Sequence, residues 1–376
     1  MKKSTLSLLV ILILGIALLF TACGDGKQGA APGDKPGAGA VSPDNPAAEK
    51  KQLIGMLVKD ATAEYIQAFM IGAQNYCDEH NIEIKIIDGG YDTMKFLDGI
   101  NQYIMQGIDG FIIAAVEDPV AIIPGIEQLN ELGIPVMALD GCPSGGRVEM
   151  FITFDLADSS RRATEKMIEG IKSAHGGTVP PGVIIEITGA LVDMFAQECM
   201  KGFRQALEPY PQLTIASGEG KWFNEDAFSR TADLLTRYGD EVLGIYCQTP
   251  DIMGSGTVAA VESVGRDPKD YFICGICLGS EGIELVREGK LYSVVEQPAL
   301  SSAIFAVQFL DDLYNGRPIP KVGDTVEEEG AIWSPAHIID NEFADEGATM
   351  ILQGPMVPQD FSVDDPRLWE NILFGK

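Results

Sequence analysis

Basic residues are scarce in this chain of 376 residues, and histidines are scarcer still. Only 27 Lys and Arg stand against 55 Asp and Glu, which gives a formal net charge of −28. Nucleic acids and anionic lipid headgroups are bound through clusters of Lys and Arg, so a chain this acidic is not expected to bind either of them. The three histidines, His80, His175 and His337, share no zinc-ligand spacing with the cysteines. The sequence therefore predicts no nucleic-acid partner and no metal site.

Signatures of catalysis and of nucleotide cofactors are also missing. No Gly-x-Gly-x-x-Gly motif follows the first apolar run, and Gly279-Ser280-Glu281-Gly282 is not a phosphate-binding P-loop. The polar residues that follow the apolar runs include no Ser-His-Asp constellation. We therefore expect a protein that is not an enzyme and that binds no cofactor.

Cysteines are few in this chain and are widely scattered. Apart from Cys23, they are Cys77, Cys142, Cys199, Cys247, Cys274 and Cys277. An even number leaves disulfide bonds as one interpretation. A chain of this length can bury a core without them, however, and the scattered spacing favours free, buried thiols.

The first 23 residues have the organisation of an export signal. Met1-Lys2-Lys3 is basic, residues 6–20 are almost wholly apolar, and Thr21-Ala22-Cys23 follows. The apolar run is shorter than the about 20 residues of a spanning helix, which favours a signal peptide over residues 1–22, with an uncleaved signal anchor as the alternative. The stretch resembles the lipobox of bacterial lipoproteins, with Phe20 in place of the usual leucine. That resemblance implies cleavage before Cys23, lipidation of Cys23 and anchoring to the outside of a bacterial membrane.

Residues 24–51 are rich in Gly, Ala, Pro, Asp and Lys and have no apolar period. Such a composition is typical of a disordered linker. We therefore interpret residues 23–51 as a tether between the lipid and a folded domain.

Apolar runs then alternate with segments of helical period. Residues 53–58 form a continuous apolar run, which is typical of a strand buried on both faces, and a helical segment follows over 63–80. Further strands are predicted at 82–88, 110–115, 135–139 and 150–153, and then at 183–187, 213–216, 242–247, 272–276, 292–295 and 331–339, with a last helix over 366–373. Strands that alternate with helices predict βαβ units. The expected fold class is α/β, with two doubly wound, Rossmann-like parallel sheets in series.

Short motifs spread between residues 53 and 316 resemble those of the type I periplasmic sugar-binding proteins, the ribose- and galactose-binding group that serves ABC transporters. The motifs include Ile54-Gly55-Met56, residues 106–110, residues 132–136, Asp140, Phe154-Asp155, Lys201-Gly202-Phe203, residues 251–256, residues 288–291 and Gln297-Pro298. The resemblance implies two lobes joined by three crossings, near Asp155, Gln297 and Val322, with the ligand in the cleft between the lobes.

Placed on this chain, the resemblance divides the sequence into discontinuous lobes. The N-terminal lobe is expected to comprise residues 52–155 and 297–322, and the C-terminal lobe residues 156–296 and 323–345. Residues 346–376 are expected to form an extension that packs on the lobes.

The resemblance also implies a function. A monomeric, lipid-anchored receptor would capture a small polar ligand, a sugar or polyol above all, by hinge closure and deliver it to an ABC transporter permease. One alternative is a ligand sensor for a chemoreceptor or histidine kinase. Another is a binder of a non-sugar ligand such as a nucleoside or an amine.

The family's binding residues can be carried over by position. They are Tyr65, Asp140, Asp155, Phe195, Gln197, Trp222, Thr249, Asp251, Cys277, Glu296 and Gln297. Tyr65 and Trp222 match ring-stacking aromatics, with a core role and a surface-loop role as their alternatives. Asp140 matches an acid that accepts hydroxyl hydrogen bonds, with a turn cap beside Gly141 as its alternative. Helix capping is an alternative for Asp155 and the favoured interpretation of Asp251.

Several positions depart from the family pattern. Gly141 and Gln197 stand where sugar-binding arginines are expected, and Cys277 stands in place of an aspartate. Pro250 stands in place of a family asparagine, and Thr249 is the nearest polar group. The family's glutamine at the second crossing aligns with Glu296, and Gln297 is the next residue in this chain. Loss of bidentate arginines weakens discrimination between pairs of hydroxyls. A cleft with Asp140, Glu296 and further acids such as Asp60 or Glu117 would suit a neutral polyol, and it would also suit a ligand that carries a positive charge.

Overall fold

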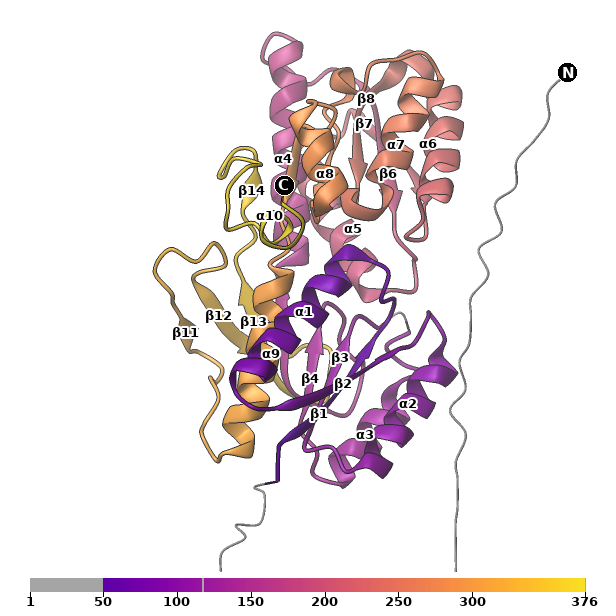
Figure 1. Ribbon diagram of the computed structural model, residues 1–376. Helices are drawn as coiled ribbons and strands as arrows, with labels where there is room; N and C mark the ends of the chain where they lie inside the picture. Colours follow the sequence, from indigo (N-terminus) through magenta and orange to yellow (C-terminus); the bar gives the residue numbers. More distant parts are fainter. Residues whose placement is uncertain (1–49, 117, 376) are drawn as a thin grey trace, which may run out of the picture. The chain divides into compact units, whose positions relative to one another are not determined.

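The computed structural model describes residues 50–116 and 118–375, which form two α/β lobes, each built on its own sheet (Figure 1). The predicted signal peptide over 1–22, the lipidation site Cys23 and most of the tether lie outside the described residues, as does Glu117. The expected fold class is confirmed, because helices flank two mostly parallel sheets. Within the described ranges, no helix combines the length and the apolar character that crossing a membrane requires.

The first lobe contains an eight-stranded sheet in the order β11-β12-β13-β5-β4-β3-β1-β2. Its strands are β1 (Leu53–Val58), β2 (Glu83–Asp88), β3 (Gly110–Ala114), β4 (Val136–Leu139), β5 (Arg147–Phe154), β11 (Thr325–Val326), β12 (Ala336–Asp340) and β13 (Glu346–Leu352). The strands from β13 to β2 are parallel, whereas β12 is antiparallel to both of its neighbours. All residues of β1 after the first are buried, as the continuous apolar run predicted for a central strand.

Four helices cover the two faces of this sheet. They are α1 (Glu64–Glu79), α2 (Thr93–Gln106), α3 (Ile123–Glu131) and α9 (Ala299–Tyr314). Met56 and Val58 of β1 belong to the core that includes α1 and α9, whereas Leu57 belongs to the core that includes α2 and α3. Alternate side chains of a strand point to opposite faces, so a single apolar run supplies both cores.

The second lobe contains a six-stranded sheet in the order β14-β10-β9-β8-β6-β7, parallel except for β14. Its strands are β6 (Gly182–Thr188), β7 (Leu213–Glu219), β8 (Val242–Cys247), β9 (Cys274–Ile276), β10 (Ser293–Val295) and β14 (Met356–Val357). Its helices are α4 (Leu156–Ala174), α5 (Met194–Leu207), α6 (Asn224–Tyr238), α7 (Pro250–Ser263) and α8 (Gly279–Arg287), with short 3-10 turns η1 (Gly239–Glu241) and η2 (Pro268–Tyr271). Helix α4 packs on α5, and α7 packs between α6 and α8.

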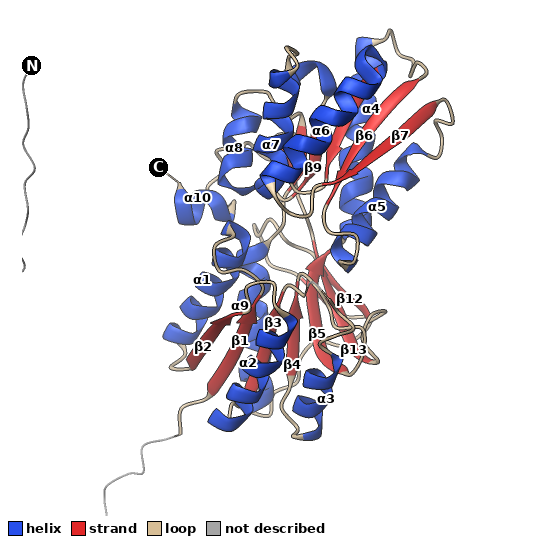
Figure 2. Cartoon of the chain, turned by 90° about the vertical axis from the view of Figure 1, so that its right-hand side faces the viewer, coloured by secondary structure: helices blue, strands red, loops and turns tan. Residues whose placement is uncertain are grey.

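The chain passes between the two lobes three times (Figure 2). The first passage joins β5 to α4 at Asp155, and the second joins β10 to α9 at residues 296–298. The third joins β13 to β14 at residues 353–355 rather than near Val322, where the family resemblance placed it.

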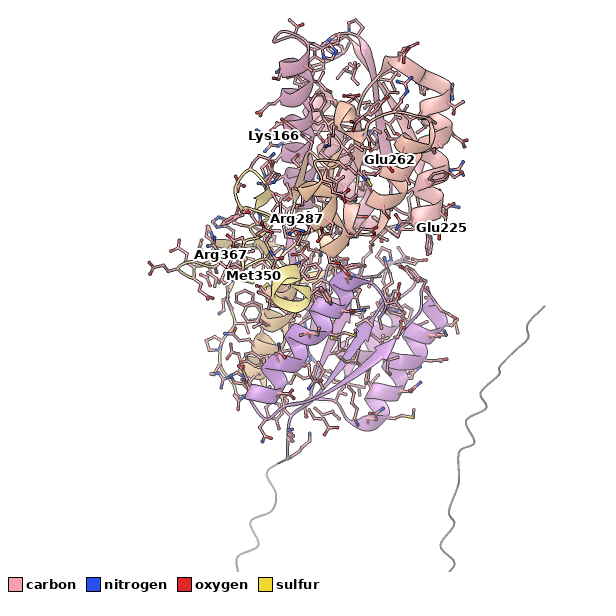
Figure 3. The ribbon with its side chains drawn as sticks, turned by 45° about the horizontal axis from the view of Figure 1, so that its top comes forward. Lys166, Glu225, Glu262, Arg287, Met350 and Arg367 are labelled. Carbon is pink, nitrogen blue, oxygen red and sulfur yellow. The ribbon has the colours of Figure 1, made fainter. Side chains whose placement is uncertain are left out.

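The late passage changes the expected division of the chain. Residues 323–345 were placed in the second lobe, but they contain β11 and β12, which extend the first sheet. Residues 346–352, expected in the C-terminal extension, form β13, which pairs along the whole of β5. Pairing with β13 covers the outer edge of β5, and Met350 of β13 is fully buried (Figure 3).

The rest of the C-terminal segment packs against the second lobe and the crossings. Strand β14 pairs with β10, and helix α10 (Trp369–Phe374) contacts α8. Arg287 of α8, labelled in Figure 3, donates a hydrogen bond to Asp364 at 2.6 Å. Trp369 is buried in the core of the first lobe, so α10 contacts both lobes.

The six cysteines of the described ranges are free and buried, as their spacing predicted. Burial raises the pKa of the Cys77 and Cys247 thiols to about 12. Little thiolate is present on such groups at neutral pH, which indicates that these residues fill space in the core.

Candidate functional site

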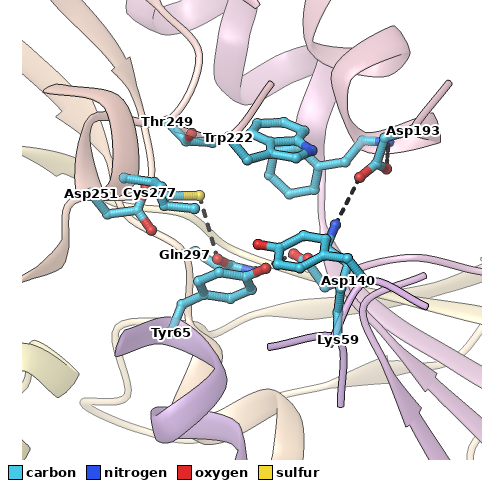
Figure 4. Close-up of a pocket in the computed structure, with 12 residues that line it drawn as sticks. Lys59, Tyr65, Asp140, Asp193, Trp222, Thr249, Asp251, Cys277 and Gln297 are labelled. Atoms are coloured by element: carbon cyan, nitrogen blue, oxygen red, sulfur yellow. Dashed lines mark hydrogen bonds and ion pairs between the residues drawn. The ribbon is translucent and has the colours of Figure 1, made fainter. Parts of the chain in front are cut away.

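A cavity lies between the two lobes, at the carboxyl ends of the strands (Figure 4). It is lined by Lys59, Tyr65, Tyr91, Asp140, Asp193, Phe195, Trp222, Thr249, Asp251, Ile252, Cys277 and Gln297. Most of these residues follow a parallel strand within a few positions, for example Lys59 after β1 and Cys277 after β9. This edge is where open α/β sheets bind ligands.

Four of the lining residues have a left-handed backbone. The φ angles of Tyr91, Asp140, Trp222 and Cys277 are 58°, 66°, 68° and 67°. Non-glycine residues avoid this region at a cost of order 1–3 kcal/mol each, and such residues cluster at functional sites. Their concentration around one cavity makes it the candidate functional site.

Aromatic rings form two sides of the cavity. The Trp222 indole packs edge-on against Phe195 at a centroid distance of 5.8 Å. It lies over Gly189, where a Cβ atom would come within 2.0 Å of the ring. Tyr65 packs edge-on against Phe69 at 5.9 Å, so it lines the cavity and also contributes to the core.

An ion pair joins the lobes across the cavity. Lys59 Nζ lies 3.0 Å from Asp193 Oδ2, and the two side chains are 4% and 3% exposed. Burial opposes protonation of Lys59, but Asp193 and Asp140 outweigh it and raise the pKa of the ammonium group. The same Nζ lies 5.6 Å from the Tyr91 ring centroid and 5.7 Å from that of Trp222, which are cation–π distances.

Asp140 and Asp251 bring two more carboxyl groups to the cavity. Asp140 accepts a hydrogen bond from Gln297 Nε2 at 2.6 Å. Burial raises the pKa of Asp140 to about 7, although Lys59 lowers it. The pKa of Asp251 is also raised, by burial and by the neighbouring Asp140.

Several polar atoms at the cavity have no hydrogen-bond partner among the described residues. They are Asp251 Oδ1, Thr249 Oγ1 and Trp222 Nε1. Thr249 and Trp222 are only 3% and 5% exposed. Buried polar atoms without partners are rare in folded proteins, so these three indicate a place for a polar ligand.

The structure brings together eight of the eleven candidate residues: Tyr65, Asp140, Phe195, Trp222, Thr249, Asp251, Cys277 and Gln297. The capping interpretation of Asp251 was wrong. Helix α7 begins at Pro250, with Thr249 as its N-cap, and Asp251 lies in the first turn.

The other three candidates do not line the cavity. The Asp155 carboxylate accepts from the Asp158 amide at 2.7 Å and caps α4, which was its alternative interpretation. Gln197 is bonded to the Leu191 carbonyl on the exposed side of α5. Glu296 is buried behind the cavity, where its carboxylate accepts from Leu278 N and Trp369 Nε1. The acid Asp60 is bonded locally to Thr62 and also lies outside the lining.

Four lining residues were not among the candidates: Lys59, Tyr91, Asp193 and Ile252. Lys59 stands directly after the apolar run of β1, and Asp193 directly precedes α5. Position at the carboxyl end of a strand was a usable signal for Lys59. Nothing in the sequence pairs it with Asp193, 134 positions away.

The chemistry that the cavity supports is binding. In the described part of the chain, no group of three His, Cys, Asp or Glu side chains could hold a metal ion. Burial raises the pKa of Cys277 well above its ordinary value, and its thiol donates to Gln297 Oε1 at 3.4 Å. The cavity therefore presents hydrogen-bonding groups, carboxyl groups and aromatic faces to a small polar molecule.

Known proteins share this sequence pattern and fold. The family model described as periplasmic binding protein domain matches residues 54–318. The ribose import binding protein of Bacillus subtilis is 23% identical over 286 residues, which cover 75% of this chain and 88% of that protein. A galactofuranose-binding protein superposes with a TM-score of 0.71 at 16% identity, covering 86% of this chain and all of the other. The fructose-binding periplasmic domain of a hybrid two-component system has a TM-score of 0.69 at 19% identity, covering 86% and 95%.

Proposed function

We propose that this chain, which belongs to the type I periplasmic binding protein family, captures a small sugar or polyol outside the cytoplasm and delivers it to an ABC transporter. Members of the family bind solutes and are not enzymes. The observation that carries the proposal is the cavity between the lobes, which combines aromatic faces with buried hydrogen-bonding groups. Ring C–H groups of a sugar pack on aromatic faces such as Tyr65 and Trp222. Its hydroxyl groups hydrogen-bond to carboxyl, amide and hydroxyl side chains such as Asp140, Gln297 and Thr249.

The names of the related proteins support a sugar as the class of ligand. The Bacillus subtilis relative is named for ribose, and the two structural relatives for galactofuranose and fructose. Sequence identities of 16–23% do not transfer any one of these sugars to this chain. They favour testing pentoses, hexoses and polyols first.

Ligand capture would proceed by closure of the lobes. Contacts that link the lobes include the Lys59–Asp193 ion pair and Glu64 of α1, which accepts from Ser280 N at 2.8 Å. Opening of the lobes would break contacts of this kind. A ligand held by both lobes therefore shifts the population toward the closed form.

We place the anchor at Cys23, with the linker after it as a tether. The lipobox resemblance supports this part of the proposal. A tether of about 30 residues keeps the receptor near the membrane and raises its effective concentration at a permease.

The test is a thermal unfolding screen of the purified protein with pentoses, hexoses, inositols, linear polyols, nucleosides and amines. A ligand at 100 times its Kd stabilises a protein by about 2.7 kcal/mol, which raises the melting temperature by several degrees. The proposal expects at least one sugar or polyol to do so. A panel in which only nucleosides raise the melting temperature would contradict it. Two further assays separate transport from sensing. Uptake of the identified ligand by vesicles that contain the permease would support transport, whereas ligand-dependent autophosphorylation of a partner kinase would support sensing.

A further inference from the structure

The cavity contains more negative than positive charge. Three carboxyl groups line it, those of Asp140, Asp193 and Asp251, and Lys59 is the single cationic side chain among the described lining residues. Lys59 is bound to Asp193 at 3.0 Å. With every carboxyl group ionised, the lining therefore has a net charge of −2, and arginines are absent from it.

Asp251 is the least compensated of these groups. The largest charge effects on it come from Asp140, Glu370 and Glu64, all of them acidic. Its Oδ1 atom has no hydrogen-bond partner in the described part of the chain. Burial and these acids raise the pKa of Asp251, so in the free protein a proton offsets the cost of its negative charge, and a cationic group of a ligand can take the place of that proton.

A second, independent observation points to the same side of the cavity. Thr249 precedes Asp251 by two residues, lines the cavity and is 3% exposed, yet its Oγ1 atom has no partner. Figure 4 shows Thr249 and Asp251 on one side of the cavity, with Tyr65 and Gln297 close to Asp251. A ligand with both hydrogen-bonding and cationic groups would satisfy these side chains together.

Aromatic faces complete the surroundings of such a cation. Trp222 and Tyr91 already attract the Lys59 ammonium at 5.7 and 5.6 Å. Tyr65 lies close enough to Asp140 and Asp251 for both to act on its hydroxyl. Ammonium groups bind at aromatic faces, and more strongly where water is excluded.

We propose that the ligand is a sugar or cyclic polyol that carries a protonated amino group, and that Asp140 and Asp251 bind this ammonium group. This inference rests on the proposed function. The ring and the remaining hydroxyls would pack on Tyr65 and Trp222 and bond to Thr249 and Gln297. A neutral sugar offers no positive charge that would favour the ionised form of these two carboxyl groups. This difference in charge, rather than the pattern of hydroxyls, would set the specificity.

The experiment compares matched pairs of ligands by calorimetric titration of the full-length protein. Each pair differs by one hydroxyl replaced with an amino group: glucose and glucosamine, galactose and galactosamine, and inositol and its monoamine. We expect at least one amine to bind tenfold or more tightly than its neutral partner. Asp251→Asn should abolish this preference and leave the affinity for the neutral partner within about threefold.

A matched control is Asp226→Asn, which removes an acid from the first turn of α6, outside the cavity. It should leave the preference for the amine unchanged. Asp140→Asn provides a second test if Asp251→Asn does not fold. Neutral sugars that bind as tightly as their amines overturn the inference and leave the proposed function standing. If no sugar, polyol or amine derivative binds, both are overturned.

Discussion

Replacing Lys59 with methionine should weaken ligand binding far more than it weakens folding. The change removes the cation from a buried pair whose side chains are 4% and 3% exposed and leaves Asp193 without its partner. Breaking a buried pair by removing one member costs about 3–5 kcal/mol. In the proposed hinge closure, water would reach Asp193 when the lobes open, so this cost would fall on the closed form alone.

The expected affinity loss follows from that free energy. Since 1.4 kcal/mol corresponds to tenfold in Kd, a loss of about 3 kcal/mol is at least about 100-fold. The stability of the ligand-free protein should change by only about 1 kcal/mol, as for a solvent-exposed pair. Calorimetric titration with the identified ligand and thermal unfolding without it measure the two quantities separately.

A double variant separates lobe closure from direct contact with the ligand. Asp193→Asn removes the second charge, and its remaining side-chain oxygen can still accept from the Phe195 amide and cap α5. The double variant Lys59→Met/Asp193→Asn should therefore recover most of the lost affinity. Lys201→Met, which breaks an exposed pair with Glu198, is the matched control. The reasoning is refuted if Lys59→Met binds as tightly as the parent, or if the double variant binds no better than Lys59→Met.

Three further predictions concern other parts of the chain. Trp222→Ala should lower affinity for a sugar ligand by about 10- to 100-fold in calorimetric titration, whereas Trp222→Phe should retain most of it; parental affinity in Trp222→Ala would exclude stacking on the indole. The folded-state pKa of Asp140, about 7, lies above its ordinary value of 3.8, so the folded state binds the extra proton between these values. Stability of the ligand-free protein should therefore fall as pH rises from about 4 to 7, and Asp140→Asn should flatten that slope in thermal unfolding; an unchanged slope would show that Asp140 does not cause it. Cys23→Ser should move the protein from the membrane fraction to the soluble fraction on cell fractionation, and continued membrane association would contradict lipidation at Cys23.

Much of the fold could be predicted because the local sequence pattern of many segments agrees with their place in the folded protein. The run Leu53–Val58 is apolar throughout, and a central parallel strand is the structure that buries such a run. The segment Glu346–Leu352 was missed because it begins with Glu-Gly and is followed by Gln-Gly-Pro, which read as a loop. Its strand structure depends on pairing with β5, almost 200 positions earlier, and no local pattern records such a partner.

The candidate site, like the fold, was predicted correctly at some positions and missed at others. Position after a strand was enough to bring Asp140, Thr249 and Cys277 to the cavity. Glu296 and Gln297 are adjacent in an extended crossing, and their side chains point to different surroundings, so alignment by one position decides which of them lines the cavity. The Lys59–Asp193 pair joins two lobes and could not be read from either one alone.

The position of β13 also bears on the order in which the lobes can form during synthesis. The parallel strands of the second sheet are complete once Val295 has been made, but the first sheet, which begins with Leu53, lacks β13 until Leu352 has emerged. Only 24 of the 376 residues then remain (376 − 352 = 24). Until that point β5 has an unpaired edge, which delays completion of the N-terminal lobe. A truncation before residue 346 should therefore leave an aggregation-prone first lobe, even though every residue that lines the cavity is present.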